Sequence, residues 1–557
     1  MNRFFVVLLI AVSILVLGFS FPASTEEAVS EVTAVSTGEG CYLGVFREGA
    51  PANMGFIESF ERVYEKKPAM VMWYLDYTYD FPAADCEKVD ASGAVPHIVW
   101  EAWIWGEEDK IKLDNILNGE YDDYIKRWAK DAAKYGKPVF VRWGHEFNIR
   151  KYPWGIVNNG KDPEKYIKAY RHVHDLFTKE GADNVKWVWC FNNYPEPDNI
   201  WNEWDKSYPG DKYVDWIGID GYNWGSTQTW SGWETFQVLF RNQVRSASKK
   251  YPSKPIMIAE FGSAEDEKDA MAKAKWVKAI PSTLKVSMPQ VKAIVFFDLR
   301  KECDWRLNSC KNTENAYRQV MKDPYFLSDA KGLVDLKMEP KSFARKTAVA
   351  KKAKTPVNID GSLADWNGAE PLILSGREFF KEGYSWSGDR DISGKIYLMW
   401  DNENLYVAAD VTDNMPFSNS NKNGDIWNGD AIEIMISTDP DLSPDREYLS
   451  NKDFQIGLSP GDGRMNRPSI WIWQKRRSPK GGEIKAIRKV DPSGYILEAK
   501  IPWADLGTFR PVRKNKIGFE VALDDSDVKF QREAQLIWNG DFYFYKDPSV
   551  WGVLEFK

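Results

Sequence analysis

The stretch PVFVRWGHEFN (Pro138–Asn148) is an apolar run that ends in polar side chains, and PIMIAEFG (Pro255–Gly262) repeats this pattern further along the chain. Each apolar run has the length and the β-branched, aromatic composition of a buried strand. Each is also followed closely by a carboxylate, Glu146 in the first stretch and Glu260 in the second. The sequence therefore predicts two glutamates at the carboxyl ends of two strands.

Working outward from these stretches, short apolar runs alternate with amphipathic segments that have helical periodicity and end in glycine, as in EYDDYIKRWAKDAAKYG. The predicted strands are Tyr42–Phe46, Ala69–Leu75, Ala94–Trp100, Pro138–Trp143, Val185–Phe191, Val214–Asp220, Pro255–Glu260 and Lys292–Asp298. Eight such units indicate an α/β fold, a (β/α)8 TIM barrel, over residues 36–323. Glu146 then follows strand four and Glu260 ends strand seven, so both face the same barrel mouth.

The rest of the chain has a different character on either side of the barrel. Residues 1–24 have one arginine, a short apolar run and then small residues, which is the form of a cleaved secretory signal, although an uncleaved anchor is the alternative. Residues 324–354 are basic and lack an apolar stripe, which predicts a linker. Residues 355–557 contain many short β-rich runs separated by turns, which predicts an all-β sandwich domain.

Composition narrows the class of protein. The 557 residues carry a formal net charge of -7, which argues against a nucleic-acid partner. The chain contains 26 Trp, 25 Tyr and 29 Phe; most are expected in the cores, and some can form flat platforms for sugar rings. Among the five cysteines, Cys303 and Cys310 could form a disulfide, as could Cys41 and Cys86, whereas Cys190 reads as a buried free thiol.

Paired carboxylates at one barrel mouth are typical of glycoside hydrolysis with retention of configuration. In that reaction Glu146, among aromatic side chains, is the candidate acid/base, because desolvation raises the pKa of a carboxyl group. Glu260 is the candidate nucleophile, which must be ionised. Arg142 can supply positive charge to it and the Tyr222 hydroxyl can donate a hydrogen bond, while His145 can orient a substrate hydroxyl or the neighbouring carboxylate.

Residues from about Cys41 to Cys310 resemble the catalytic domain of glycoside hydrolase family 26. The resemblance rests on RWGHEFN, with His145 before the acid/base, and on GIDGYNWG, YPWG, ECDWRL and NVKWVWCFNN. It implies Glu146 as acid/base, Glu260 as nucleophile and Tyr222 as the hydrogen-bond donor to the nucleophile. It also implies that Trp154 lines the site and that Trp305 lies under the sugar at the cleavage point.

This resemblance is incomplete where family members often read RPxHExNGxWFWWG. The chain has Trp143 in place of the proline, Ile149 in place of the glycine and YPWG in place of WFWWG, the string associated with β-1,4-mannanases. YPWG and IVWEAWIWG, with Glu101 and Trp103, look closer to members that act on β-glucans. The substrate prediction is β-1,4-mannan or glucomannan, with mixed-linkage β-1,3-1,4-glucan as the alternative.

Residues from about Thr355 to Lys557 resemble family 9 carbohydrate-binding modules, through GDIWNGDAIEIMIS, YILEAKIPWADLG and DPSVWGVLEF. The resemblance implies sugar binding between two tryptophans, for which Trp427 and Trp538 are the candidates, and a structural Ca²⁺ with no ligand named. Core packing is the alternative for either indole.

Together these features predict a secreted, extracellular or periplasmic endo-β-glycanase that binds polysaccharide and works as a monomer. They predict no nucleic-acid partner, no membrane association after signal removal and no cofactor for catalysis. The non-enzyme alternative is a polysaccharide-binding protein with an inactive barrel, and the intact pair Glu146 and Glu260 argues against it.

Overall fold

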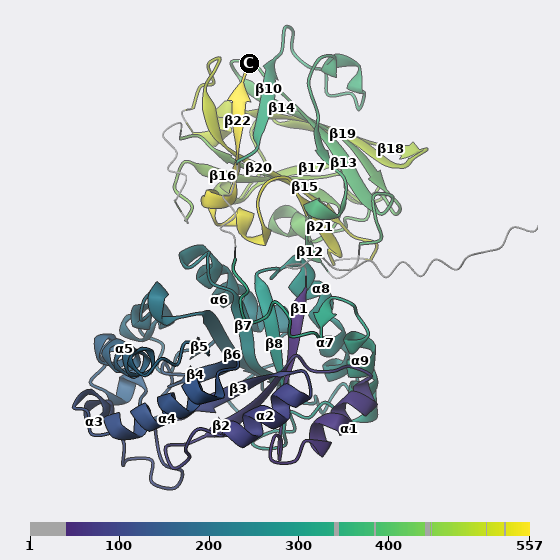
Figure 1. The fold of residues 1–557 in the computed structure, drawn as a ribbon. Coiled ribbons are helices and arrows are strands. Elements are labelled where there is room, and N and C mark those ends of the chain that lie inside the picture. Colours follow the sequence, from purple (N-terminus) through teal and green to yellow (C-terminus); the bar gives the residue numbers. More distant parts are fainter. Residues whose placement is uncertain are drawn as a thin grey trace, which may run out of the picture.

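A computed structural model describes residues 40–338, 345–383, 386–439, 446, 448–507, 509–528 and 531–557. The predicted signal, residues 1–24, lies outside these residues. The described chain forms an α/β barrel followed by a β-rich module (Figure 1). None of the helices in the described part of the chain is long and apolar enough to span a membrane.

Eight parallel strands close into a barrel, which confirms the predicted fold. They are β1 (Cys41–Arg47), β2 (Met70–Leu75), β3 (Val95–Trp100), β4 (Val139–Trp143), β5 (Val185–Asn192), β6 (Trp216–Asn223), β7 (Ile256–Ser263) and β8 (Val291–Asp298). Each strand pairs with the next along the chain, and β1 pairs with both β8 and β2, which completes the ring. The strands are almost entirely buried, as expected when helices cover a parallel sheet.

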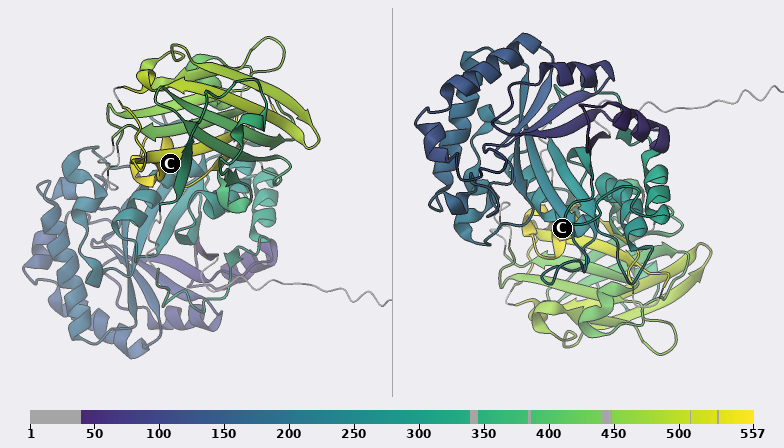
Figure 2. Two further views of the ribbon diagram at one scale, coloured as in Figure 1. Left: turned by 90° about the horizontal axis from the view of Figure 1, so that it is seen from above. Right: turned by 90° about the horizontal axis from the view of Figure 1, so that it is seen from below.

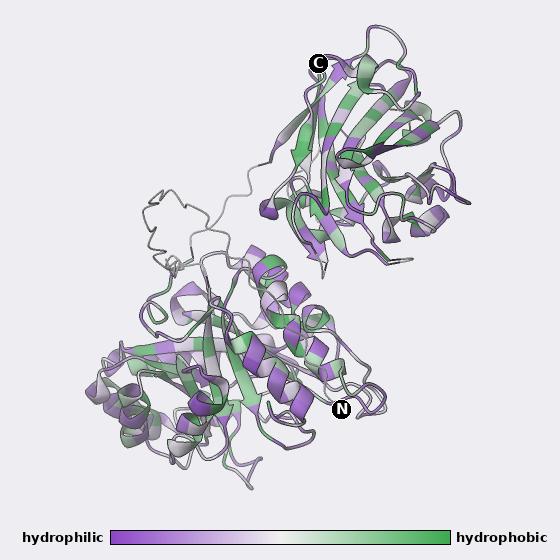
Figure 3. Cartoon of the chain, turned by 90° about the vertical axis from the view of Figure 1, so that its right-hand side faces the viewer, coloured by the Kyte–Doolittle hydropathy of each residue, from purple (hydrophilic) through white to green (hydrophobic). Residues whose placement is uncertain are grey.

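Helices surround the strands on the outside of the barrel (Figure 2). They are α1 (Gly55–Tyr64), α2 (Ala83–Ala91), α3 (Leu113–Leu117), α4 (Asp122–Tyr135), α5 (Pro163–Lys179), α6 (Phe236–Lys250), α7 (Ala272–Lys278), α8 (Ile280–Val286) and α9 (Lys311–Met321). The helix α4 ends at Gly136, whose φ of 70° is the left-handed conformation that favours glycine. Colouring by hydropathy shows green barrel strands inside helices with many purple residues (Figure 3).

The C-terminal module consists of two mainly antiparallel sheets that enclose a second apolar core. One sheet contains β11 (Leu372–Leu374), β13 (Ile392–Trp400), β14 (Asn404–Asp413), β18 (Glu483–Val490) and β19 (Ser493–Pro502). The other contains β12 (Phe380–Gly383), β15 (Ala431–Ser437), β16 (Asp453–Ser459), β17 (Ser469–Ile472), β20 (Lys516–Asp525), β21 (Ala534–Ile537) and β22 (Gly552–Phe556). β10 (Thr347–Lys352) pairs with both β13 and β22 and joins the two sheets.

The predicted linker, residues 324–354, is shorter in the structure. β9 (Phe326–Leu327) pairs with β1 of the barrel, and β10 is a strand of the module. The reason lies in the stretch TAVAKK, where Ala348 and Ala350 are buried in the module core while the lysines face outward. Residues at alternating positions on a strand face the same side, so both alanines can enter the core. Two alanines do not form a strongly apolar stripe, so the sequence does not reveal this strand.

The cysteine pairs suggested by the sequence are not formed, because all five cysteines are free thiols. The Cys303 thiol donates instead to the Thr227 hydroxyl at 3.2 Å. Cys190 is fully buried, as predicted, and its Sγ lies 3.5 Å from a guanidinium nitrogen of Arg142.

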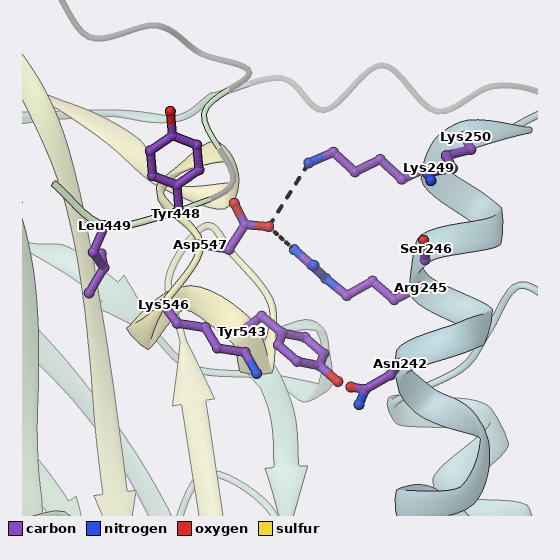
Figure 4. Close-up of a pocket in the computed structure, with 10 residues that line it drawn as sticks. All are labelled: Asn242, Arg245, Ser246, Lys249, Lys250, Tyr448, Leu449, Tyr543, Lys546 and Asp547. Carbon is purple, nitrogen blue, oxygen red and sulfur yellow. Dashed lines mark hydrogen bonds and ion pairs between the residues drawn. The ribbon is translucent and has the colours of Figure 1, made fainter. Parts of the chain in front are cut away.

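The module contacts the barrel mainly through α6. Arg241 donates to Glu382 at 3.0 Å, and its guanidinium lies 3.7 Å from the ring centroid of Phe542. One turn further along, Arg245 forms ion pairs with Asp541 and Asp547. Figure 4 shows Arg245 and Lys249 reaching from this helix toward Asp547 across a pocket of about 560 Å³. Ion pairs on one helix therefore tie the two domains together.

Candidate active site

Glu146 lies three residues beyond the end of β4, in a turn with an unusual backbone. Gly144 has a φ of 58° and Glu146 a φ of 49°, and a non-glycine residue rarely adopts such an angle. The Glu146 amide donates to the Cys190 carbonyl of β5 at 3.0 Å, which holds the turn against the neighbouring strand. Strained backbone that the surroundings hold in place is a feature of functional sites. The turn buries the Glu146 side chain to 7% exposure at the barrel mouth.

Glu260 lies within β7 and has hydrogen-bond donors on both carboxylate oxygens. Its Oε1 accepts from the Tyr74 hydroxyl at the end of β2 and from Arg142 Nη2 of β4. Its Oε2 accepts from the Tyr222 hydroxyl of β6 at 2.7 Å. Donors and a positive charge both stabilise the ionised form of a carboxylate. Side chains from three other strands thus hold the Glu260 carboxylate in place.

Arg142 is fully buried and bridges two carboxylates. Its Nη1 lies 2.7 and 2.8 Å from the two oxygens of Asp220, and its Nη2 contacts Glu260. The guanidinium of arginine is planar, so one side chain can bind two acids in fixed positions. Arg142 has no exposed surface, and its contact with Glu260 supplies the positive charge that was expected there.

Glu146 has a different environment from Glu260. The Asn192 amide donates to its Oε1 at 2.6 Å, and no ion pair to Glu146 occurs among the described residues. Burial raises the pKa of Glu146 to about 7, the charge of Glu260 adds to this rise, and the Asn192 hydrogen bond opposes it. A carboxyl group with a pKa near neutrality can give up a proton and take it back.

His145 is buried beneath Glu146 among aromatic rings. Its Nε2 lies 3.1 Å from the Tyr152 hydroxyl, and burial lowers its pKa well below the usual value, which makes it a neutral imidazole. Trp154 donates from Nε1 to the His145 carbonyl at 2.6 Å and stacks on Tyr152 at a centroid distance of 4.6 Å. Trp154 is only 1% exposed and supports the turn that carries His145; its place in the lining of the substrate site stays a prediction.

Tyr222 connects Glu260 to a group of indoles. The ring of Trp305 lies 4.8 Å from that of Tyr222, and Trp224 lies edge-on to Trp305 at 4.9 Å. Trp305 itself is 1% exposed, so in this structure it packs behind Tyr222 and presents almost no face to a sugar. The predicted position of Trp305 under the sugar would require these rings to part.

Several functional side chains were absent from the sequence prediction. Tyr74, Asn192 and Asp220 each lie at the end of a strand that was itself predicted, and each contacts a catalytic candidate or Arg142. Their place at the carboxyl ends of strands is the signal that could have found them. Glu101 after β3 accepts from the indoles of Trp103 and Trp105, at 3.0 and 2.6 Å, and so fixes aromatic rings beside the mouth.

The two indoles predicted as sugar platforms of the module differ. Trp427 is 38% exposed, with the Arg532 guanidinium 5.1 Å from its ring centroid. Trp538 is 6% exposed and packs in the module core 5.9 Å from Phe519, which favours the alternative of core packing for this indole. Trp538 follows Leu536 by two residues, and side chains at that spacing on a strand face the same side, here the core.

The module also contains a cluster of three acidic side chains, Asp413, Asp525 and Asp527, with one oxygen of each within 4.8 Å of the others. An oxygen of each is buried and has no hydrogen-bond donor within the described chain. Burial and the neighbouring negative charges raise the pKa of Asp525 to about 9, and burial raises that of Asp413 to about 7. Unpaired carboxylate oxygens in this arrangement fit a hard cation such as Ca²⁺.

Comparison with known proteins assigns both domains. Residues 107–276 match the model of glycosyl hydrolase family 26, and residues 359–557 match that of the carbohydrate family 9 binding domain-like group. The chain is 38% identical to Endoglucanase H of Acetivibrio thermocellus over 282 residues, 49% of this chain and 29% of that protein. It is 31% identical to Endo-1,4-beta-xylanase A of Thermotoga neapolitana over 205 residues, 36% of this chain and 17% of that protein.

Among solved structures, the catalytic domain of the Bacillus sp. JAMB-750 GH26 Endo-beta-1,4-mannanase is 17% identical, covers 54% of this chain and 89% of that chain, and gives a TM-score of 0.43. The chain spans less than a third of the length of either curated relative. The family matches nevertheless agree with the observed barrel and β-rich module. The barrel therefore carries the match to glycosyl hydrolase family 26, and the β-rich module carries the match to the carbohydrate family 9 binding domain-like group.

Proposed function

We propose that this protein is an endo-acting β-glycan hydrolase that retains anomeric configuration, with Glu260 as nucleophile and Glu146 as acid/base. One observation carries the proposal: two buried carboxylates at the same mouth have opposite surroundings. Glu260 accepts from Arg142, Tyr74 and Tyr222, which favour its anion, whereas the pKa of Glu146 is raised to about 7. Two carboxyl groups in such different surroundings can divide the nucleophilic and acid/base roles between them.

In the first step Glu260 attacks the anomeric carbon while Glu146 protonates the departing glycosidic oxygen. In the second step Glu146 takes a proton from water, which releases the sugar from Glu260. Arg142 and Tyr222 hold the nucleophile in position, and Asp220 holds Arg142. Asn192 orients Glu146 without neutralising its charge, so the acid can act reversibly.

For the substrate we propose a β-glucan, with β-1,4-mannan or glucomannan as the second candidate. The chain has Tyr152-Pro153-Trp154-Gly155 where the mannanase-associated aromatic string would stand, and the Tyr152 and Trp154 rings are buried on one another. The 38% identity to a protein named as an endoglucanase supports the same choice. Mannan remains a candidate because the sequence around Glu146 resembles the family in which mannanases occur.

Product stereochemistry and a substrate panel test this function. Mixed-linkage β-glucan, glucomannan, mannan and xylan are incubated with the protein, and we expect reducing ends to appear fastest from mixed-linkage glucan. The first product observed by NMR should be the β-anomer. Glu260→Ala should lose activity by on the order of 10⁴-fold or more, and added azide should restore turnover with the α-azide product. No activity on any glycan would contradict the enzyme and favour an inactive binding barrel.

We also propose that Asp413, Asp525 and Asp527 hold a structural Ca²⁺ in the module. The support is the fit of the residues: three carboxylates, two of them almost fully buried, with oxygens that lack protein donors. The ion would neutralise charges that burial makes costly. It takes no part in the barrel chemistry.

A further inference from the structure

The loop between β6 and α6, residues 224–235, carries three tryptophans that the proposed chemistry does not use. Trp224 contacts Trp305 behind Tyr222, and the ring of Trp230 lies 5.5 Å from that of Trp224. Exposure rises along this series: Trp305 is buried, Trp224 is half-buried and Trp230 is 70% exposed. An exposed patch of large apolar side chains often marks a binding surface.

The third indole of the loop, Trp233, lines a cavity of about 670 Å³ between the barrel and the module. Its ring lies against the backbone of Gly225, next to Trp224, where a Cβ atom would come within 3.3 Å of it. Trp427 and Arg532 of the module also line this cavity. The β6–α6 loop thus extends from the Glu260 side of the barrel to the half-exposed indole of the module.

Hydrogen bonds join the two ends of the loop to each other and to α7. Asn223 is fully buried, and its side-chain oxygen accepts from the amides of Gly225 and Glu234, so it joins the two ends of the loop. The Ser231 hydroxyl donates to the Gly225 carbonyl at 2.7 Å, and Trp276 of α7 donates from Nε1 to the Glu234 carbonyl at 3.0 Å. These bonds define the path of the loop backbone that carries the three indoles.

Most charged side chains that line the cavity are paired within the protein; Asp266, which has no ion pair among the described residues, accepts from the amides of Lys268 and Asp269. Lys275 pairs with Asp269 at 2.9 Å, Glu382 pairs with Arg241, and Arg532 pairs with Asp524 at 3.0 Å. A pocket with paired charges and flat indole faces suits a neutral ligand that has both apolar faces and hydroxyl groups. A chain of neutral sugars has this chemistry.

We propose that Trp224, Trp230 and Trp233 form a binding row for a neutral β-glycan chain, which extends from the catalytic barrel to the cavity shared with Trp427. The row lets one chain contact both domains at once, so it selects long chains over short ones. The inference rests on the proposed function, since it takes the substrate of the barrel to be the same glycan.

Binding by an inactive variant tests the row. In the Glu260→Gln protein, the dissociation constants for soluble mixed-linkage β-glucan and for a trisaccharide from it are measured by calorimetry. We expect Trp230→Ala and Trp233→Ala to raise the dissociation constant for the polymer by roughly three- to tenfold. The dissociation constant for the trisaccharide should rise by a smaller factor. Trp230→Tyr, which keeps a flat ring, should recover most of the polymer affinity.

Tyr448→Ala serves as the matched control, because Tyr448 is 72% exposed, much like Trp230, and lies outside the row. It should leave polymer binding unchanged, and thermal melting checks that each variant is folded. Two results would overturn the proposed row. In the first, Trp230→Ala and Trp233→Ala bind the polymer as tightly as their Glu260→Gln parent does. In the second, the parent itself binds no polymer. Hydrolysis by the protein with Glu260 intact reports on the proposed function separately.

Discussion

The barrel and the module each bury a group of carboxylates, but only the barrel supplies its own positive charge. Glu260 and Asp220 share the guanidinium of Arg142, and two tyrosines complete the hydrogen bonds of Glu260. Asp413, Asp525 and Asp527 have no ion pair within the described chain. A buried anion costs several kcal/mol unless it is paired. The barrel group is therefore charge-paired within the protein, whereas we propose that the module group takes a cation from outside.

Removing Arg142 should leave the barrel carboxylates without a cation, as in the module, and should have the largest effect on stability and activity. Arg142→Met leaves Glu260 and Asp220 buried without a cation, so we expect the free energy of unfolding to fall by about 3–5 kcal/mol and kcat/KM to fall by on the order of 10³-fold. Chemical denaturation and initial rates on β-glucan measure both. The double variant with Glu260→Gln should regain part of the lost stability; stability unchanged in Arg142→Met would refute the role of Arg142 as charge partner.

Removing one hydrogen bond of Glu260 should have a smaller effect than removing its charge partner. Tyr222→Phe deletes the 2.7 Å hydrogen bond to Oε2 and keeps the ring against Trp305. We expect kcat/KM to fall by roughly 10- to 100-fold, as for loss of a hydrogen bond to a charged group, with little change in stability. The pH profile should keep its fall above pH 7, since that limb belongs to Glu146. A shift of that limb would show that Tyr222 acts on the acid instead.

Removing the cation from the module should have the smallest effect on stability, and this effect should depend on pH. The pKa values of about 7 for Asp413 and 9 for Asp525 lie above the unfolded value of about 3.9. An acid whose pKa is raised in the folded state loses stability between its unfolded and its folded pKa. With chelator present, module stability is therefore highest below about pH 4 and falls as the pH rises from there through 7 to 9. We expect its Tm to fall by a few °C or more, at roughly 2–4 °C per kcal/mol.

Calorimetry across this pH range, with chelator and with Ca²⁺, measures the fall. Added Ca²⁺ should restore the Tm, and Asp525→Asn should flatten the pH dependence in chelator while reducing the response to Ca²⁺. A Tm that ignores both pH and Ca²⁺ would show that the cluster needs no cation and would remove the contrast with the barrel.

The sequence predicted the barrel because its signal is local. Each strand is a short apolar run with a turn or helix after it, and the runs containing Arg142 and Glu260 match β4 and β7 closely. The spacing of Leu536 and Trp538 is an equally local signal. Side chains two residues apart on a strand face the same side, so this spacing places Trp538 in the core beside Leu536. The sequence did not predict β10, because its buried residues Ala348 and Ala350 are small and do not form a clear apolar run.

The site was only partly predictable, since its contacts join distant parts of the chain. Tyr74 and Glu260 are 186 residues apart, and Arg142 and Asp220 are 78 apart. No pattern within one strand shows which side chains of other strands it will meet. Exposure is also a property of the folded chain: Trp154 and Trp305 have suitable ring chemistry, yet both rings are covered by neighbours.

The positive φ of Glu146 has a consequence for anyone who needs a trapped complex of this protein. Asparagine and glycine tolerate that backbone angle better than glutamate does. Glu146→Asn therefore removes the acid and relaxes the turn at the same time, and it also removes a carboxyl group whose burial is unfavourable above pH 7. The inactivated protein should be at least as robust as the parent, which makes residue 146 the preferred position for preparing substrate-bound crystals.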